Sequence, residues 1–278
     1  MSMNIELPDW LDACRPDDAL YADAYEGTPA ELRALLKTAI AFAFHRWPSM
    51  DGENSLIRRS GRSGFAHEEL RRPAPWVLAL IGPGFASPAR LLAALIPAVI
   101  AGTGRILIVS EKPFSPAVCT ALELAGLEDS FLLDAEQMPG LYEDLRACSA
   151  DGRIVAFPGA DGIFTPAQQE LLHDAALDGL PRYRDLPQPR ILSLHDEGSE
   201  TEARLRWLHP DAELLRTPGP GISAVFTPRT GASLSPNFPA FLCGPGMEAC
   251  WSGPAPDFYT TSSCAAFFVQ EPALEDHA

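Results

Sequence analysis

Short apolar runs alternate with helix signals through the middle of the chain, and this alternation constrains its fold more than any other feature. Strand-like runs occur at 76–81, 106–109, 131–133, 154–157 and 191–194. The segments between the runs are long enough for helices of about ten residues, which is the pattern of βαβ units. Fully apolar strands are typical of parallel sheets covered on both faces. The sequence therefore predicts an α/β fold with a doubly wound, mainly parallel sheet.

Three expected helix starts between these runs share one chemical pattern. A hydroxyl residue precedes a proline at Ser87, Ser115 and Thr165. The hydroxyl accepts a hydrogen bond from a free amide of the first turn, and the fixed φ of proline suits the position after it. Pro97 falls inside the first of these helices and predicts a kink or a short break there.

The segments that flank this pattern are expected to form separate units. We expect an N-terminal helical extension at 1–72, an α/β nucleotide-binding-like domain at 73–228 and a loop-rich C-terminal segment packed on it at 229–278. Thr28 and Glu31 form a T-x-x-E pattern, which predicts that a helix starts at Thr28. An arginine cluster between residues 58 and 72 predicts a solvated loop, with an anion-contacting loop as the alternative.

Charge and composition exclude several classes of function. The 278 residues include 21 Lys and Arg against 37 Asp and Glu, a net charge of −16. Nucleic acids and anionic membranes bind proteins largely through basic side chains, so neither is an expected partner. The longest apolar run, 91–101, is about half the roughly 20 residues of a membrane span. Six cysteines without a C-x-x-C pair suggest neither a metal site nor a disulfide framework, and we expect a cytoplasmic protein.

The crossing from the first strand to the first helix is the strongest candidate for a ligand site. It contains Gly82, Pro83 and Gly84, where the backbone can approach a ligand closely and a helix N-terminus favours anions. A tight turn without a ligand is the alternative. Glu111 follows the next strand and could accept hydrogen bonds from an adenine ribose, with a solvated surface charge as the alternative.

Several segments in this order resemble one enzyme family. The GPG turn at 82–84, IPAVIAG at 96–102, ILIVS at 106–110 and LAGL at 124–127 are similar to the cofactor domain of histidinol dehydrogenase. They resemble the aldehyde dehydrogenase superfamily more distantly. RIVAFPGADGI at 153–163 resembles the turn that faces the nicotinamide nucleotide in aldehyde dehydrogenases. The resemblance implies a Rossmann-like domain and NAD or NADP as cofactor, contacted by Gly82, Pro83, Gly84, Ser110, Glu111 and Gly159.

The chain also departs from the family at the positions that carry its chemistry. Between Glu197 and Arg204 the family has a long segment with metal ligands, which this sequence lacks, so no metal site is expected. The P-E-H that supplies the family's general base is matched by Pro210-Asp211-Ala212, in which alanine cannot move a proton. We therefore expect a catalytically degenerate relative that acts as a binding or assembly module and retains nucleotide binding at most. An active NAD(P)-dependent oxidoreductase on an aldehyde or amino alcohol is the alternative.

Three further side chains are weak catalytic candidates. His195 and Asp196 stand at the carboxyl end of an expected sheet strand and could serve an unrelated small-molecule activity in the same cleft. Cys243 is followed by a glycine and could act as a nucleophile, with a structural thiol as the alternative. The sequence favours a small molecule or nucleotide as ligand, and a second copy or another protein as a partner of assembly.

Overall fold

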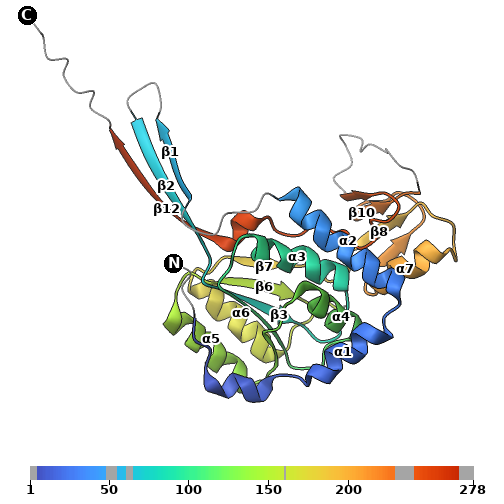
Figure 1. Ribbon diagram of the computed structural model, residues 1–278, viewed down its shortest axis with the longest axis horizontal. Helices are drawn as coiled ribbons and strands as arrows, with labels where there is room; N and C mark the ends of the chain where they lie inside the picture. Colours follow the sequence, from blue (N-terminus) through green and yellow to red (C-terminus); the bar gives the residue numbers. More distant parts are fainter. Residues whose placement is uncertain (1–4, 48–54, 61–64, 160, 229–240, 269–278) are drawn as a thin grey trace, which may run out of the picture.

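The computed structural model describes residues 5–47, 55–60, 65–159, 161–228 and 241–268. Its centre is a parallel sheet of five strands in the order β5-β4-β3-β6-β7 (Figure 1). The strands are β3 (Trp76–Ile81), β4 (Arg105–Ser110), β5 (Ser130–Leu132), β6 (Arg153–Phe157) and β7 (Arg182–Arg184). The predicted α/β class is therefore confirmed.

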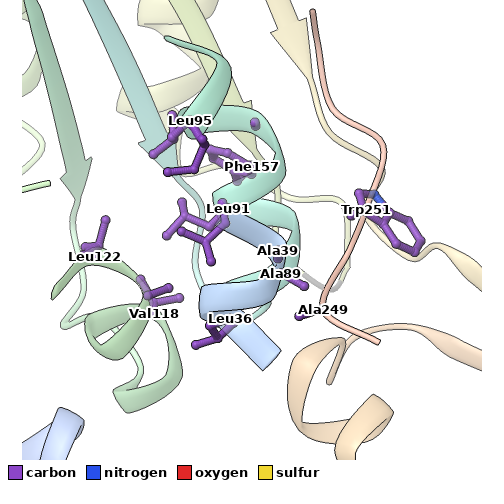
Figure 2. Packing of buried hydrophobic residues seen from close by; sticks show 14 of the residues in the cluster. Leu36, Ala39, Ala89, Leu91, Leu95, Val118, Leu122, Phe157, Ala249 and Trp251 are labelled. Atoms are coloured by element: carbon purple, nitrogen blue, oxygen red, sulfur yellow. The ribbon is translucent and has the colours of Figure 1, made fainter. Parts of the chain in front are cut away.

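Helices cover both faces of this sheet, because its central strand is apolar on both sides. All six residues of β3 are buried, with Val77, Ala79 and Ile81 in one core cluster and the alternate residues in a second. The first face is covered by α1 (Asp18–Gly27), α2 (Ala30–Arg46), α3 (Pro88–Ile100) and α4 (Pro116–Ala125). The second is covered by α5 (Gln137–Cys148) and α6 (Pro166–Leu177). Figure 2 shows Leu91 and Leu95 of α3 packed among α2, α4 and the sheet.

The predicted Ser/Thr-Pro helix starts are confirmed. Ser87, Ser115 and Thr165 are the N-caps of α3, α4 and α6, and each hydroxyl oxygen accepts a backbone hydrogen bond from the first turn. The helix start predicted at Thr28 is wrong, because Thr28 ends α1 and its hydroxyl donates to the carbonyl of Ala24 instead. Helix α2 begins two residues later, after Pro29 and without a side-chain cap.

Helix α3 continues through Pro97 to Ile100, so the short break that was one alternative does not occur. Proline has no N–H to donate to the Ala93 carbonyl one turn earlier. The C-terminal segment approaches this carbonyl closely at Gly253, where an added Cβ would lie 2.1 Å from the Ala93 oxygen. Packing against the proline turn of α3 thus explains the glycine of the Ser252-Gly253-Pro254 segment.

A second parallel sheet lies beside the first, in the order β11-β10-β8-β9 (Figure 1). Its elements are β8 (Arg190–Ser193), α7 (Glu200–Leu208), β9 (Glu213–Leu215), β10 (Ile222–Phe226) and β11 (Phe241–Cys243). The expectation that all five apolar runs share one sheet therefore holds for four of them. The exception is 191–194, because β7 already pairs with β6 and occupies the outer position of the first sheet.

A third, antiparallel sheet projects from the body (Figure 1). We call it the arm, and it consists of β1 (Ser55–Ser60), β2 (Phe65–Pro73) and β12 (Thr260–Phe268) in that order. The solvated loop predicted for the arginine cluster is therefore wrong, because most of that segment forms β1 and β2. Short 3-10 helices at Asp9–Cys14 and Pro256–Tyr259 complete the described elements. None of the helices in the described ranges has the length and apolarity needed to cross a bilayer.

Candidate functional site

The carboxyl edge of the five-stranded sheet carries the loops predicted to bind a cofactor. The chain runs from β3 to β4 and β5 on one side and then returns to β6 on the other. The topological switch point, where open α/β sheets bind ligands, is therefore the crevice between the loops that follow β3 and β6. Gly82, Pro83 and Gly84 lie in the first of these loops, and Gly159 lies in the second.

These two loops pack directly on one another and close the crevice. The backbone N–H of Gly82 donates to the carbonyl of Phe157 at 2.7 Å. A Cβ added at Gly82 would lie 2.8 Å from the Gly159 nitrogen, and one added at Gly159 would lie 1.9 Å from the Pro83 oxygen. Contact between the two backbones therefore accounts for both glycines, and among the described residues it occupies the crevice between the two loops.

Side chains from the neighbouring elements join across the end of β3. Glu111, directly after β4, accepts a hydrogen bond from the hydroxyl of Thr165 at the start of α6. Gln168 is fully buried, completes a capping box with Thr165 and donates from its amide to the Ile81 carbonyl at 2.8 Å. The carboxylate predicted to bind a ribose is thus hydrogen-bonded to the protein itself.

A small pocket remains beside this closed crevice, between the loops that follow β3 and β4. Its volume is about 140 Å³, and Gly82, Gly84, Ser110 and Lys112 are among the residues that line it. The hydroxyl oxygen of Ser110 accepts a hydrogen bond from the Lys112 amide at 3.1 Å. Pockets for drug-sized ligands have volumes of roughly 300–1,000 Å³. The space suits a small anion better than a dinucleotide.

A buried ionic cluster lies at the N-terminal end of α3, where the two parallel sheets meet. The guanidinium of Arg90 lies 3.0 Å from a carboxylate oxygen of Asp185 and also forms an ion pair with Asp211. Asp185 directly follows β7, and Asp211 follows α7. The side chains of all three residues are at least 97% buried. We call Arg90, Asp185 and Asp211 the ionic cluster.

The ionic cluster contains one positive group for two carboxyl groups. Desolvation raises the pKa of Asp185 to about 6 against the opposing effect of Arg90, and it raises the pKa of Asp211 as well. His209 is completely buried beside the cluster, and burial lowers its pKa to about 3, so its ring is neutral. Its Nε2 lies 3.0 Å from the Glu248 carbonyl. Burial thus favours the protonated form of both carboxyl groups, and Arg90 opposes this effect at each of them.

Sequence reasoning missed this cluster as a unit. Arg90 was visible only as the charged residue that begins a long apolar run in α3. Its partners are 95 and 121 positions away, and no local pattern connects them. Asp211 was singled out only because it matches the family's general base. In the structure the Asp211 carboxyl group is buried and forms an ion pair with Arg90. This carboxyl group is therefore not accessible to a substrate in solvent.

The remaining candidates lie in the second sheet. His195 and Asp196 follow β8, so they stand at the end of a different sheet from Gly82 and Gly159. The His195 carbonyl accepts a hydrogen bond from Arg216 at 2.8 Å, and Asp196 is exposed.

Cys243 ends β11, is 2% exposed, and its thiol lies 3.7 Å from the carbonyl of Cys250. Burial raises the pKa of the Cys243 thiol, which disfavours the reactive thiolate. Within the described ranges, no group of three or more His, Cys, Asp and Glu side chains is arranged to hold a metal ion.

Comparison with known proteins relates the chain to others through its fold. No family model matches the sequence, and no curated protein matches it. The structure of histidinol dehydrogenase from Elizabethkingia anophelis aligns with a TM-score of 0.54 at 11% identity, over 92% of this chain and 77% of that one. The resemblance read from the sequence is therefore confirmed at the level of the fold.

Aldehyde dehydrogenases give weaker matches. A putative aldehyde dehydrogenase from Bacillus subtilis aligns with a TM-score of 0.35 at 13% identity, over 71% of this chain and 50% of that one. Lactaldehyde dehydrogenase from Escherichia coli aligns with a TM-score of 0.36 at 16% identity, over 67% of this chain and 42% of that one. The chain spans half or less of the length of these two proteins.

Proposed function

We propose that this chain is a binding or assembly module with the fold of histidinol dehydrogenase and without dehydrogenase activity. The observation that carries the proposal is the burial of Asp211 and its ion pair with Arg90. The resemblance places this residue where the family has its general base, yet its carboxyl group is buried and paired with Arg90. A general base must lie within hydrogen-bonding reach of the proton that it takes, and the buried carboxyl group of Asp211 contacts Arg90 instead of solvent.

The residues at the sheet edge do not fit a dinucleotide. NAD or NADP would need the crevice between the loops after β3 and β6, which the contact between Gly82, Pro83 and Gly159 fills. We therefore derive no hydride-transfer step for this chain. Binding of a nucleotide through a phosphate group alone is the second candidate, and the pocket of about 140 Å³ beside Ser110 and Lys112 favours it.

We place the module in the cytoplasm. All six cysteines are unpaired, including the exposed Cys148 and Cys264. Exposed thiols that remain reduced are typical of a reducing compartment.

A turnover assay tests the proposed function. The purified protein is mixed with NAD or NADP and with a panel of aldehydes and amino alcohols, with and without zinc, while the absorbance of the reduced cofactor is followed. We expect the same background rate for the wild type and for Asp211→Asn. Turnover that saturates with cofactor would overturn the proposal. Its loss in Asp211→Asn, with the fold retained by circular dichroism, would assign the activity to Asp211.

A further inference from the structure

A polar groove lies at the amino edge of the five-stranded sheet, the edge opposite to the loops after β3 and β6. Its volume is about 550 Å³, within the roughly 300–1,000 Å³ that is typical of ligand pockets. The groove is lined by the first turns of α1, the C-terminal end of α4 and the first residue of β5. Helices α1 and α4 pack on one another there (Figure 1). We call this feature the α1–α4 groove.

The α1–α4 groove has an excess of negative charge. Asp18, Glu123 and Glu128 line it, and all three are exposed. Within the described ranges, none of these carboxylates has an ion-pair partner or accepts a side-chain hydrogen bond. The C-terminal end of α4 adds partial negative charge, because its last turn contains no basic residue to compensate the helix dipole. The groove therefore attracts cationic groups.

Arg15 also lines the groove, but its charge is already compensated by other carboxylates. Its guanidinium lies 3.1 Å from a carboxylate oxygen of Asp12 and 3.0 Å from one of Asp129. Its Nη1 donates to the backbone carbonyl of Glu128 at 3.0 Å, and the guanidinium carbon lies 4.7 Å from the centre of the Phe131 ring. Arg15 therefore does not neutralise the three free carboxylates.

Two hydroxyl groups in the groove provide a hydrogen-bond donor. The hydroxyl oxygens of Tyr21 and Ser130 lie 2.5 Å apart, and Ser130 is 3% exposed. One hydrogen lies between the two oxygens, and among the described residues neither hydroxyl group has a further partner. The second hydroxyl hydrogen therefore needs an acceptor, which a ligand in the groove can supply.

We propose that the α1–α4 groove binds a basic peptide segment of another protein. Arginine and lysine side chains match the three free carboxylates, and a peptide carbonyl accepts the hydrogen that Tyr21 and Ser130 leave free. An aliphatic polyamine would satisfy the carboxylates but has no acceptor for this hydrogen. The net charge of −16 attracts a basic partner and repels a second copy of the chain. The inference rests on the proposed binding role and gives that role a kind of partner.

Fluorescence anisotropy with a labelled peptide of sequence GRGRG, blocked at both ends, tests the proposal. We expect saturable binding to the wild type that weakens as the salt concentration rises. The double variant Glu123→Gln, Glu128→Gln should bind about fivefold to tenfold more weakly, the loss expected for two exposed ion pairs. Absence of saturable binding to the wild type would overturn the proposal.

The matched control is the double variant Asp23→Asn, Glu26→Gln. It removes the same amount of charge from exposed positions of α1 that are not among the residues lining the groove. We expect its affinity for the peptide to stay within about twofold of the wild type, because salt screens charges outside the groove. An equal loss of affinity in the two double variants would show only general attraction to an acidic protein and would overturn the proposed site.

Competition with spermidine tests the part of the proposal that concerns the peptide carbonyl. Spermidine has more positive charge than the peptide but no carbonyl group, so we expect it to displace the labelled peptide less effectively than unlabelled peptide does. Equal or stronger displacement would overturn the assignment to a peptide. Circular dichroism checks that each variant retains the fold.

The binding measurements omit nucleotide and dehydrogenase substrates, so they are independent of the turnover assay. Turnover in that assay would refute the proposed function without affecting the α1–α4 groove. Failure to bind the peptide would refute the groove assignment alone.

Discussion

At the scale of single residues, the feature that most distinguishes this molecule is the ionic cluster. Arg90 is 1% exposed and compensates two carboxyl groups from different parts of the chain. Burying a charge without a partner of opposite charge costs several kcal/mol. Removal of the cation and removal of one carboxylate therefore have different effects on stability. Removal of Arg90 leaves two buried carboxyl groups without a cation, whereas removal of one carboxylate leaves a balanced pair.

This imbalance predicts different effects for two substitutions. Arg90→Met should lower the free energy of unfolding by about 3–5 kcal/mol, the usual cost of breaking a buried ion pair. Asp211→Asn should cost about 1 kcal/mol, because Asp185 still balances Arg90 and the amide keeps a hydrogen-bonding oxygen. Urea unfolding followed by circular dichroism measures both. Equal losses for the two variants would contradict the assigned charge balance.

The raised pKa of Asp185 predicts a pH dependence of stability. Its folded pKa of about 6 exceeds the unfolded value, so the folded protein binds the proton more tightly. The protonated Asp185 carboxyl group therefore contributes stability that is complete below about pH 4 and is lost as the pH rises through about 6. The contribution lost over this range is about 3 kcal/mol.

The pKa shifts of other groups change the free energy of unfolding in the opposite direction, so their contribution must be subtracted. The lowered pKa values of Glu202 and His209 make the folded protein more stable as the pH rises. The measurement is therefore the difference in unfolding free energy between the wild type and Asp185→Asn at several values between about pH 4 and 8. The wild type should lose stability relative to the variant as the pH rises, and a flat difference would refute the raised pKa.

At the scale of elements, the fold depends on loops that pack without side chains between them. The loops after β3 and β6 approach each other through Gly82, Pro83 and Gly159. Within the described part of these loops, the same contact occupies the crevice in which a parallel sheet usually binds its ligand. The glycines that suggested a cofactor site in the sequence are thus required by backbone packing.

Gly159→Ala tests this packing. The new Cβ would lie 1.9 Å from the Pro83 oxygen, and the overpacking should cost about 1–3 kcal/mol. Gly140→Ala is the matched control, because Gly140 lies in α5 with no atom within 4 Å of an added Cβ. Alanine in a helix should stabilise the protein there by about 0.5–1 kcal/mol. If Gly159→Ala unfolds at the same urea concentration as the wild type, the two loops do not pack as described.

The elements that sequence reasoning predicted are those specified by local chemistry. The four buried strands of the first sheet and the caps at Ser87, Ser115 and Thr165 follow from neighbouring residues. The arm was missed because β12 pairs with β2 about 190 residues earlier, and neither strand alternates cleanly between apolar and polar residues. The sequence correctly placed the glycine-containing loops and Glu111 at the ends of β3, β4 and β6. The packing of the loops after β3 and β6 on each other was not predicted, because it depends on contacts between segments far apart in the sequence.

At the scale of the whole molecule, two parallel sheets are joined through buried polar groups and an arm extends from them. Arg90 links the first sheet to the segment after α7, and the Ser87 hydroxyl donates to the Leu208 carbonyl at 2.8 Å beside it. The molecule has the fold of histidinol dehydrogenase, and we propose that it uses this fold for assembly instead of catalysis.

The central claim is that the crevice at the switch point is closed to a dinucleotide, and calorimetric titration with NAD and NADH tests it most directly. Ligand that binds only the folded state also raises its stability, so thermal unfolding with the same ligands provides a second readout. We expect no saturable heat and no thermal shift up to about 1 mM of either cofactor, the range of weak binding. Saturable binding of NADH, with a matching rise in melting temperature, would contradict the account.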